Sequence, residues 1–411
     1  MTRNVRVLGG FQTDFSKNWA REEKDLTALF TETLQGGFEA AHVLPGEVES
    51  AHVGNFTAEL FCDQGHLGGF FTAAAPEMAG TPAMRHEAAC ASGSMAMLSA
   101  MAEIEAGRYD LVAVLGIEMM RNVPGTQAAA YIGPPAMWAG RECVGVKYPW
   151  PHMFGKLGEE YERRYGLKRE HLSAISKINF ENAKRNPNSQ TRKWGFEDAS
   201  FTADDDVNPV IDGMIRKHDC SQMTDGGAVV FLASDEKAAE IVARAGRTLD
   251  DAPRISGWGH KTAHIGLNEK LAESHDAEYV FPHVRSAILD MYKRAGITTT
   301  DDYDGVEVHD CFTPTEYMAI DHLGLTAPGE GWKAIERGDI ALGGKLPINP
   351  SGGLIGCGHP VGATGVRMML DCWKQVTERA GDYQVTNAKR FGMLNLGGSA
   401  TTAAAFMLDR D

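Results

Sequence analysis

A cysteine between an extended segment and a predicted helix is the first residue here that could carry chemistry. Cys90 lies in His-Glu-Ala-Ala-Cys-Ala-Ser-Gly-Ser-Met-Ala, residues 86–96, and the helix is expected to begin near Ser92. The unpaired amides and positive dipole end of a helix N-terminus favour a thiolate and can hold a developing oxyanion. The position predicts a nucleophile, with an inert core cysteine as the alternative.

A second glycine-rich turn, also before a predicted helix, contains a histidine. The segment Gly-Cys-Gly-His-Pro-Val-Gly-Ala-Thr-Gly spans residues 356–365, with His359 near its centre. Its third glycine comes one position too late for a dinucleotide-binding fingerprint. Glycines around His359 leave room for close contact with a ligand. The alternative is a tight turn whose histidine only satisfies the local backbone.

A third segment, His-Asp-Cys-Phe-Thr at residues 309–313, directly follows a predicted strand. His309 and Cys311 are two positions apart and are expected to share a face, at a strand end where sites in α/β proteins collect. The triplet His-Asp-Cys recurs at residues 218–220, where we interpret it as structural. Because the paired spacings of zinc sites, such as CxxC or HxxxH, are missing, no metal site is predicted.

Alternating strands and helices must position these residues. Apolar, β-branched runs predict buried strands at residues 5–8, 111–115, 228–232, 305–308 and 392–396. Helical apolar spacing marks residues 25–41, 94–106, 153–165, 284–295 and 366–380. Gly107 and Gly296 each follow a helix where a left-handed residue closes the last turn. Together these patterns predict an α/β protein.

Two parts of the chain repeat the same order of elements, which indicates an internal duplication. A helix ending near residue 41 precedes a turn and a strand at residues 48–53, and a helix ending near residue 295 precedes a turn and a strand at residues 303–309. Each half then has a cysteine-containing, glycine-rich turn that enters a helix. Residues 121–224 are richer in Trp, Tyr, Pro, Lys and Arg and are interpreted as an inserted subdomain.

Composition limits the classes of partner. The chain has 411 residues, 43% of them apolar, which is enough for a large core and two or three domains. Its 40 basic and 55 acidic residues give a net charge of −15, which argues against nucleic acid or an anionic membrane as a general partner. An anionic ligand must then be bound locally. A segment containing Lys184, Arg185, Arg192 and Lys193 could supply that positive surface, or could be a solvated loop.

The cysteines and the termini suggest a compartment. Seven cysteines are widely spaced, odd in number and without a CxxC pair, so no disulfide framework is expected and a cytoplasmic location is predicted. No stretch approaches about 18 consecutive apolar residues, and the N-terminus has no signal-like apolar run. The sequence predicts neither membrane insertion nor export.

Four segments in order resemble the thiolase superfamily, most closely its branch related to the thiolase domain of sterol carrier protein 2. They are Cys-Ala-Ser-Gly at 90–93, Asp-Gly-Gly-Ala-Val-Val at 225–230, His-Asp-Cys-Phe at 309–312 and Cys-Gly-His-Pro-Val-Gly-Ala-Thr-Gly at 357–365. The resemblance implies a five-layered αβαβα core from two similar halves, with a loop domain over the coenzyme A site. We place the N-terminal half at 1–120 and 225–250, the loop domain at 121–224 and the C-terminal half at 251–411.

The resemblance also implies roles for individual residues. Cys90 matches the acylated nucleophile, and His359 matches the histidine that takes its proton. His309 matches a histidine that helps His359 to hold the thioester oxygen. The main-chain N–H groups of Cys90 and Gly397 match a second oxyanion hole.

Two further residues are expected to contact the substrate. Ser221 matches a serine that contacts coenzyme A. Phe154 is expected to line the acyl-CoA pocket, the alternative being an ordinary buried aromatic residue.

This sequence departs from the commoner thiolases in two places. They have an asparagine where this chain has His309, and they carry a second catalytic cysteine where this chain has Asn395. In the branch resembled here, the cysteine of the His-Asp-Cys-Phe motif is thought to supply the missing acid/base. That role is therefore assigned to Cys311.

The implied activity is that of an acetyl-CoA C-acyltransferase. It would cleave a 3-oxoacyl-CoA to acetyl-CoA and a shortened acyl-CoA, or run the reverse Claisen condensation, with coenzyme A as co-substrate and no permanently bound cofactor. Alternatives on the same fold are a retro-aldolase acting on a steroid-type side-chain thioester, a carbon-acyltransferase, and a non-catalytic subunit that binds acyl-CoA or lipid. Since family members are dimers or tetramers, a homodimer or homotetramer is expected, with a partner subunit as a further possibility.

Overall fold

The apolar runs predicted as strands form buried strands in the computed structural model, which describes residues 3–410. Every residue of β4 (Leu111–Glu118) and β7 (Gly226–Ala233) is buried, because helices cover both faces of the sheet. The remaining strands of the large sheet are β1 (Arg6–Gln12), β2 (Ser50–Gly54), β3 (Ala83–His86), β8 (Arg254–Thr262), β9 (Gly305–Val308), β10 (Arg390–Gly397) and β11 (Thr402–Asp409).

The sheet consists of two similar halves. The strand order is β3-β2-β4-β7-β1-β8-β11-β10-β9, and β1 and β8 share the single register pair Arg6↔Arg254. In the first half, β1, β7 and β4 pair antiparallel and β4 continues in parallel to β2. In the second half, β8, β11 and β10 pair antiparallel and β10 continues in parallel to β9. The same sequence of strand directions therefore occurs twice, in the order expected for a duplicated chain.

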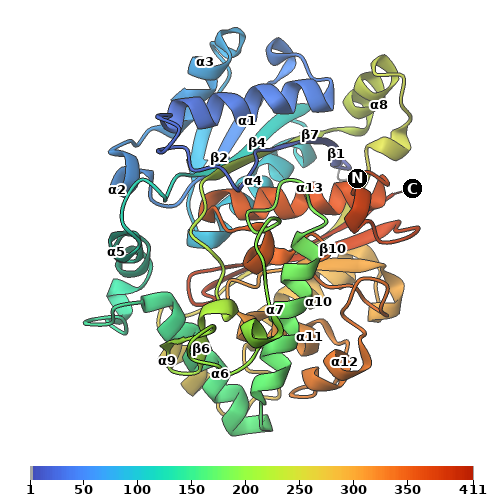
Figure 1. Ribbon diagram of the computed structural model, residues 1–411. Coiled ribbons are helices and arrows are strands. Elements are labelled where there is room, and N and C mark those ends of the chain that lie inside the picture. The colour runs from blue at the N-terminus through green and yellow to red at the C-terminus, as the bar shows by residue number, and fades with distance from the viewer. Residues whose placement is uncertain (1–2, 411) are drawn as a thin grey trace.

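Helices form three layers around the two halves of the large sheet (Figure 1). Helix α1 (Leu26–Ala41) packs on β1 and β7, and α10 (Pro282–Ala295) packs on β8 and β11. Between the two halves lie α4 (Ser92–Glu105) and α13 (Thr364–Val376), and α13 contacts strands of both. Lys374 is the one residue of α13 that is not buried. The layers run helix, sheet, helix, sheet, helix, which confirms the expected α/β class and five-layered core.

The chain between β4 and β7 covers one end of the second half. It contains α5 (Gly125–Met137), α6 (Pro149–Tyr165), α7 (Arg169–Ala183) and a small hairpin of β5 (Val210–Asp212) and β6 (Ile215–Arg216). Helices α6 and α7 pack on α11 (Thr313–Leu323). The other helices are α2 (Ala58–Cys62), α3 (Phe70–Ala74), α8 (Asp235–Arg244), α9 (Leu267–Glu273) and α12 (Gly331–Arg337). The domain boundaries at residues 120, 224 and 250 stay a prediction.

Two details of the helices deserve comparison with the sequence. The helix predicted to reach residue 380 ends at Val376, and Glu378 has a left-handed φ of 59°. Gly296 closes α10 in the left-handed region, as predicted. Among residues 3–410, no helix has both the length and the apolar character needed to cross a bilayer.

Glycines allow the turn before α13 to approach β4 and the end of β2 closely. A Cβ on Gly116 of β4 would lie 2.5 Å from the carbonyl oxygen of Gly362, just before α13. A Cβ on Gly362 would lie 2.6 Å from the Cα of Asn55, at the end of β2. Because these neighbours are backbone atoms, they cannot move aside as a flexible side chain would. Any side chain at these positions would push the two halves apart.

This packing predicts the effect of one added methyl group. Gly116→Ala should lower the free energy of unfolding by about 1–3 kcal/mol, the usual cost of overpacking. The midpoint of urea unfolding, followed by circular dichroism, measures the change. Gly46→Ala is the control, because a Cβ at Gly46 has no heavy atom within 4 Å. Equal unfolding midpoints for the two variants would contradict the close approach.

Candidate active site

Cys90 lies in a short 3₁₀ turn (Ala89–Ala91) that runs directly into α4. The preceding residue, Ala89, has φ 48°, a left-handed conformation that costs energy for a residue other than glycine. The Ser92 side chain holds this turn: its hydroxyl donates to the Ala89 carbonyl (2.6 Å) and accepts from the Ala88 N–H (3.0 Å). The strained turn fixes the Cys90 side chain, 9% exposed, at the helix N-terminus as the sequence predicted.

The Cys90 thiol is protonated in the free protein. Burial raises its pKa to about 12, and the Glu118 carboxylate adds to the effect, while hydrogen bonds from the N–H groups of Gly398 and of Cys90 itself act in the opposite direction. The amides at the helix N-terminus therefore act in the predicted direction, but they do not make Cys90 a thiolate. Burial outweighs the helix end, so a base must remove the proton during a reaction.

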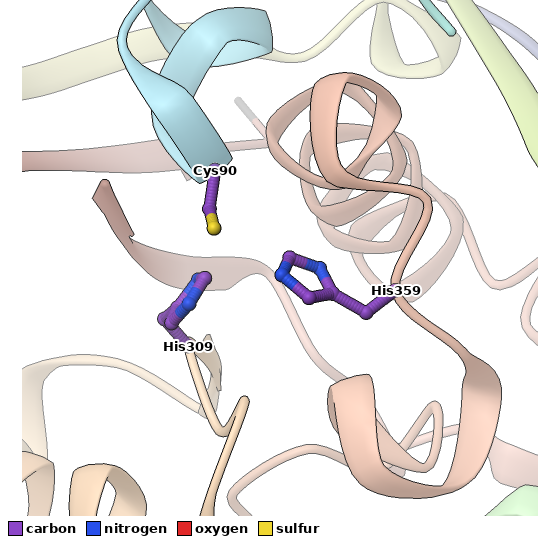
Figure 2. A group of neighbouring side chains, drawn as sticks. All are labelled: Cys90, His309 and His359. Atoms are coloured by element: carbon purple, nitrogen blue, oxygen red, sulfur yellow. The ribbon is translucent and has the colours of Figure 1, made fainter. Parts of the chain in front are cut away.

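His359 is the group placed to act as that base. Its Nδ1 lies 2.7 Å from Thr364 Oγ1, and the Thr364 hydroxyl itself donates to the Pro360 carbonyl. Thr364 Oγ1 therefore accepts a hydrogen bond from the Nδ1–H group of His359. The proton of the neutral ring stays on Nδ1, and Nε2 keeps its lone pair. Burial, with Arg367 as a second cause, lowers the pKa of His359 to about 3. Figure 2 shows this imidazole directed toward Cys90.

His309 lies next to His359, and both imidazoles lie close to the Cys90 sulfur (Figure 2). The sulfur and one nitrogen from each imidazole lie within 4.8 Å of one another, and the two rings meet edge to face at 5.3 Å. The Asn395 amide nitrogen lies 3.1 Å from His309 Nδ1, whereas Nε2 has no hydrogen-bond partner within the described residues 3–410. Burial first, and His359 second, lower the pKa of His309 well below its ordinary value. Two neutral imidazoles thus surround one protonated thiol.

Cys311 is buried, and together with Cys90 and His359 it lines a cavity that is described below. Burial raises the pKa of its thiol well above the ordinary value, and the neighbouring Cys90 raises it further. Its carbonyl accepts a hydrogen bond from the Ser221 N–H at 2.9 Å, which attaches the loop containing Ser221 to the His309 segment. Both thiols therefore hold their protons tightly in the free protein.

The turn between β10 and β11 packs against the Cys90 segment. A Cβ on Gly397 would lie 2.1 Å from the Ala88 carbonyl oxygen, so no side chain fits there. The amide that hydrogen-bonds to the Cys90 sulfur belongs to Gly398, one residue beyond the predicted donor Gly397. Lys270 supports this turn from behind. Its buried ammonium group donates to the hydroxyls of Ser399 (2.8 Å) and Thr401 (2.9 Å).

A largely apolar cavity of about 500 Å³ opens onto Cys90, Cys311 and His359. His309 is 1% exposed and is not among the residues that line it. Rings of Trp150, Phe154 and Phe312 stack along one wall, with centroid distances of 6.3 and 5.1 Å between neighbours. Ser221 and Phe154 both line the cavity, so the structure brings these predicted contact residues together with the cysteines. Its other lining residues include Met120, Ala129, Ile132, Tyr148, Met223 and Val361.

The predicted basic segment lies outside this cavity wall. Arg192 forms an ion pair with Asp14 at 2.7 Å, and Lys184 lies over the Phe196 ring. Arg185 donates to the Asn182 side chain. Because Asp14 offsets the charge of Arg192, the segment presents less free positive charge than its sequence suggests.

The second His-Asp-Cys triplet has a structural environment. His218 bonds to the Ser200 carbonyl, and Asp219 forms an ion pair with Arg169. Cys220 nevertheless lines the cavity, which the sequence did not indicate.

Two groups that organise the site escaped the sequence interpretation. Thr364 lies inside a quoted motif, but only the fold places its hydroxyl at His359. Glu118 is fully buried, and its carboxylate accepts from the N–H groups of Phe56, Thr57 and Gly362. Burial raises the pKa of Glu118 to about 7. A buried polar residue at the end of an apolar strand is the one signal that could have revealed Glu118.

Comparison with known proteins supports one family over most of the chain. Residues 5–195 match the family described as "Thiolase, N-terminal domain", and residues 267–410 match "Thiolase C-terminal domain-like". The acetyl-CoA acetyltransferase of Methanothermobacter thermautotrophicus is 32% identical over 409 residues, covering 99% of this chain and all of that protein. Human sterol carrier protein 2 is 29% identical over 416 residues, covering 96% of this chain and 70% of that protein.

Solved structures share the fold. The structure described as "Ltp2-ChsH2(DUF35) aldolase" has a TM-score of 0.76 at 18% identity, covering 99% of this chain and 98% of the other. Human mitochondrial 3-ketoacyl-CoA thiolase in complex with CoA has a TM-score of 0.68 at 20% identity, covering 100% of this chain and 98% of the other. At these identities the likeness concerns the fold alone.

The Thr364 contact predicts a change in the reactivity of Cys90. Thr364→Val removes the acceptor for His359 Nδ1–H, so the ring no longer holds its lone pair toward the sulfur. Alkylation of Cys90 by iodoacetamide, measured by peptide mass spectrometry, should slow about 10- to 100-fold, matching the loss of one strong hydrogen bond. Thr377→Val is the control, since that hydroxyl bonds only the Trp373 carbonyl on the same helix. Equal alkylation rates for both variants would rule out this role of Thr364.

Proposed function

The chain belongs to the thiolase family, and we propose that it transfers acyl groups between coenzyme A and carbon through an acyl-Cys90 intermediate. In the degradative direction it cleaves a 3-oxoacyl-CoA with coenzyme A to acetyl-CoA and a shortened acyl-CoA. In the other direction it joins two acyl thioesters by Claisen condensation. The observation that carries this proposal is the Cys90 thiol facing two neutral imidazoles, with Cys90 and His359 on the wall of an apolar cavity.

The first step is attack by Cys90 on the 3-oxo carbon of the substrate. His359 Nε2 accepts the thiol proton as the carbon–sulfur bond forms, because the thiol does not ionise on its own with a pKa of about 12. The bond between C2 and C3 of the substrate then breaks. The acyl group remains on Cys90, and the electron pair passes to the enolate of acetyl-CoA.

The enolate needs both charge stabilisation and a proton. We assign charge stabilisation at the thioester oxygen to His309 and the newly protonated His359, which are the imidazoles nearest the reacting sulfur (Figure 2). The N–H groups at Cys90 and in the Gly397–Gly398 turn hold the oxygen of the tetrahedral intermediate on the acyl group. Cys311 donates the proton, and its raised pKa suits a thiol that must remain protonated until the enolate forms.

The second half of the reaction restores the enzyme. The sulfur of free coenzyme A attacks the acyl-Cys90 thioester, its proton passing to a basic group of the site. Cys90 leaves as thiolate and is reprotonated, with Cys311 regaining the proton it gave. No oxidant, metal or tightly held cofactor enters the balance: one 3-oxoacyl-CoA and one coenzyme A give two acyl thioesters.

The apolar cavity and its aromatic wall suit the acyl chain and the pantetheine arm of coenzyme A. We propose that Ser221 and Phe154 contact that arm, since both line the cavity. A homodimer or homotetramer and a cytoplasmic location remain predictions. A partner subunit is consistent with the DUF35 protein named with one structural relative.

The retro-aldolase alternative differs at Cys90, because aldol cleavage requires no acylated thiol. The His359–Cys90 geometry favours thiolysis. An acyl adduct on Cys90, detected by mass spectrometry after mixing with a 3-oxoacyl-CoA, distinguishes the two reactions.

Removal of the nucleophile gives the first functional prediction. Cys90→Ala should abolish the burst of acetyl-CoA released from acetoacetyl-CoA and lower turnover at least about 10³-fold, since no acyl-enzyme can form. Cys62→Ala, a cysteine outside the cavity, is the matched control and should retain the burst. A normal burst in Cys90→Ala would refute the assignment.

Removal of the second thiol separates two half-reactions. Cys311→Ala should lower thiolysis of acetoacetyl-CoA about 10²- to 10⁴-fold, because the enolate loses its proton donor. Exchange of label between acetyl-CoA and free coenzyme A needs only Cys90 and should continue. Cys372→Ala, equally buried but outside the cavity, serves as the control. Loss of exchange and thiolysis to the same extent would contradict a separate acid role for Cys311.

A further inference from the structure

Asn395 is a buried polar residue at the site that the proposed mechanism does not use. It lies on β10 with no exposed surface, at the position where the commoner thiolases carry a second cysteine. Its amide lies between Ser94 of α4 and His309, and its two ends contact these two residues. Asn395 therefore links the helix that begins beside Cys90 to one of the two imidazoles.

The contact with Ser94 fixes which way the Asn395 amide points. The Ser94 hydroxyl donates to Asn395 Oδ1 at 2.7 Å and has no other hydrogen-bond partner among residues 3–410. If the amide were reversed, the Ser94 proton would face an amide N–H and would have no acceptor in a buried position. An unsatisfied buried donor costs about 1–3 kcal/mol. The orientation with Oδ1 on Ser94 is therefore preferred, and Nδ2 faces His309.

This orientation in turn fixes the proton on His309. Nδ1 of the imidazole lies 3.1 Å from the Asn395 amide N–H₂ and can only accept there. A neutral imidazole has one proton, so it must reside on Nε2. That nitrogen is fully buried and has no hydrogen-bond partner in the part of the chain that the structure describes. His309 thus presents an unused N–H donor at the site, beside Cys90 (Figure 2).

The two imidazoles are therefore opposite tautomers. Thr364 accepts a hydrogen bond from the Nδ1–H group of His359, so Nε2 of that ring has a lone pair. Asn395 donates a hydrogen bond to Nδ1 of His309, so Nε2 of that ring has the proton. Because this proton occupies Nε2, His309 has no lone pair there to bind a metal ion. The Cys90 sulfur and one nitrogen of each ring nevertheless lie within 4.8 Å of one another. One ring can accept a proton, and the other can donate to an oxygen.

We propose that Asn395, oriented by Ser94, is a positioning residue that fixes the Nε2–H tautomer of His309 and so makes this neutral imidazole a hydrogen-bond donor to the substrate thioester oxygen. The consequence for the reaction rests on the proposed function, but the tautomer itself does not. In this arrangement His309 contributes to the oxyanion hole as a neutral donor, beside the newly protonated His359. The polarity of the site comes from hydrogen-bond partners.

The direct test is the side-chain ¹⁵N NMR spectrum of His309 in the intact protein, assigned by its loss in His309→Gln. The wild-type protein should show a protonated Nε2 and an unprotonated Nδ1. A proton on Nδ1 would overturn the proposal whether or not the protein is active. Because this measurement uses the wild-type chain, it does not depend on the folding of a variant.

The variant Asn395→Asp tests the functional consequence. A carboxylate has almost the shape of the amide but can only accept, so the neutral imidazole must move its proton to Nδ1. The NMR spectrum should show that exchange, and kcat for thiolysis should fall about 10²- to 10³-fold, as for loss of an oxyanion-hole donor, with KM changed less. Unchanged kcat together with a shifted proton would refute the role of the tautomer in the reaction.

The pH profile of this variant separates positioning from a loss of structure. One proton added to the new carboxylate–imidazole pair restores N–H at Nε2, so the residual activity of Asn395→Asp should rise, relative to wild type, as the pH falls. The titratable or charged groups around His309 are His359, Arg367, Cys90, Asp310 and Cys311, and all are unchanged in the variant. A constant activity ratio across pH would contradict the proposal.

Two controls complete the experiment. Asn268→Asp adds the same charge at an exposed position outside the cavity and should leave kcat and its pH profile unchanged. Ser94→Ala frees the Asn395 amide to turn and should lower kcat about 3- to 10-fold, whereas Ser99→Ala, on the same helix, should not. If the wild-type chain cleaves no 3-oxoacyl-CoA, the proposed function fails while the NMR result still decides the tautomer.

Discussion

The close approach of two helix N-termini between the sheets is the constraint on which the site depends. Cys90 begins the first of these helices and His359 precedes the second, so the two side chains meet only if the helices nearly touch. Gly116 and Gly362 allow the turn before the second helix to lie against β4 and the end of β2, where their nearest neighbours are backbone atoms of the other half. Glu118 reinforces it, since one buried carboxylate accepts N–H groups at the end of β2 and from Gly362. Backbone packing of the fold thus sets the distance between nucleophile and base.

Burial then decides the charge state of the site. In a low-dielectric environment the thiols keep their protons and the imidazoles lose theirs, so the free protein holds almost no charge around Cys90. Two neutral histidines have no intrinsic difference in role. Their differences arise from the groups behind them, a hydroxyl that accepts at His359 and an amide that donates at His309. The hydrogen bond at Nδ1 of each imidazole can therefore decide which ring is a base and which is a donor.

Charged groups lie close behind this neutral layer, and buried ion pairs hold part of their charge. Arg367 on α13 has no exposed surface and contacts Glu307 and Asp371 at 2.9 and 3.0 Å. Removing one partner of such a cluster would leave an uncompensated buried charge, so the cluster ties α13 to β9 firmly. Lys270 plays a comparable part beneath the turn that faces Cys90, and its burial lowers its pKa to about 8. The net charge of −15 is thus no guide to the polarity of the site.

The sequence by itself determined the class of fold, the positions of the central buried strands and of the helices that pack on them, and the types of residue that carry chemistry. Apolar periodicity is local, and Cys90, His309, Cys311 and His359 lie in short motifs that can be read along the chain. Tertiary structure alone decided the protonation and orientation of these groups. Asn395 and Glu118 form hydrogen bonds to residues on other elements, and Thr364 forms one to His359 in the turn before its own helix. The desolvation of each side chain depends on the residues that pack around it. The short motifs do not reveal these hydrogen bonds or the degree of desolvation, because both depend on how the folded chain buries these segments together.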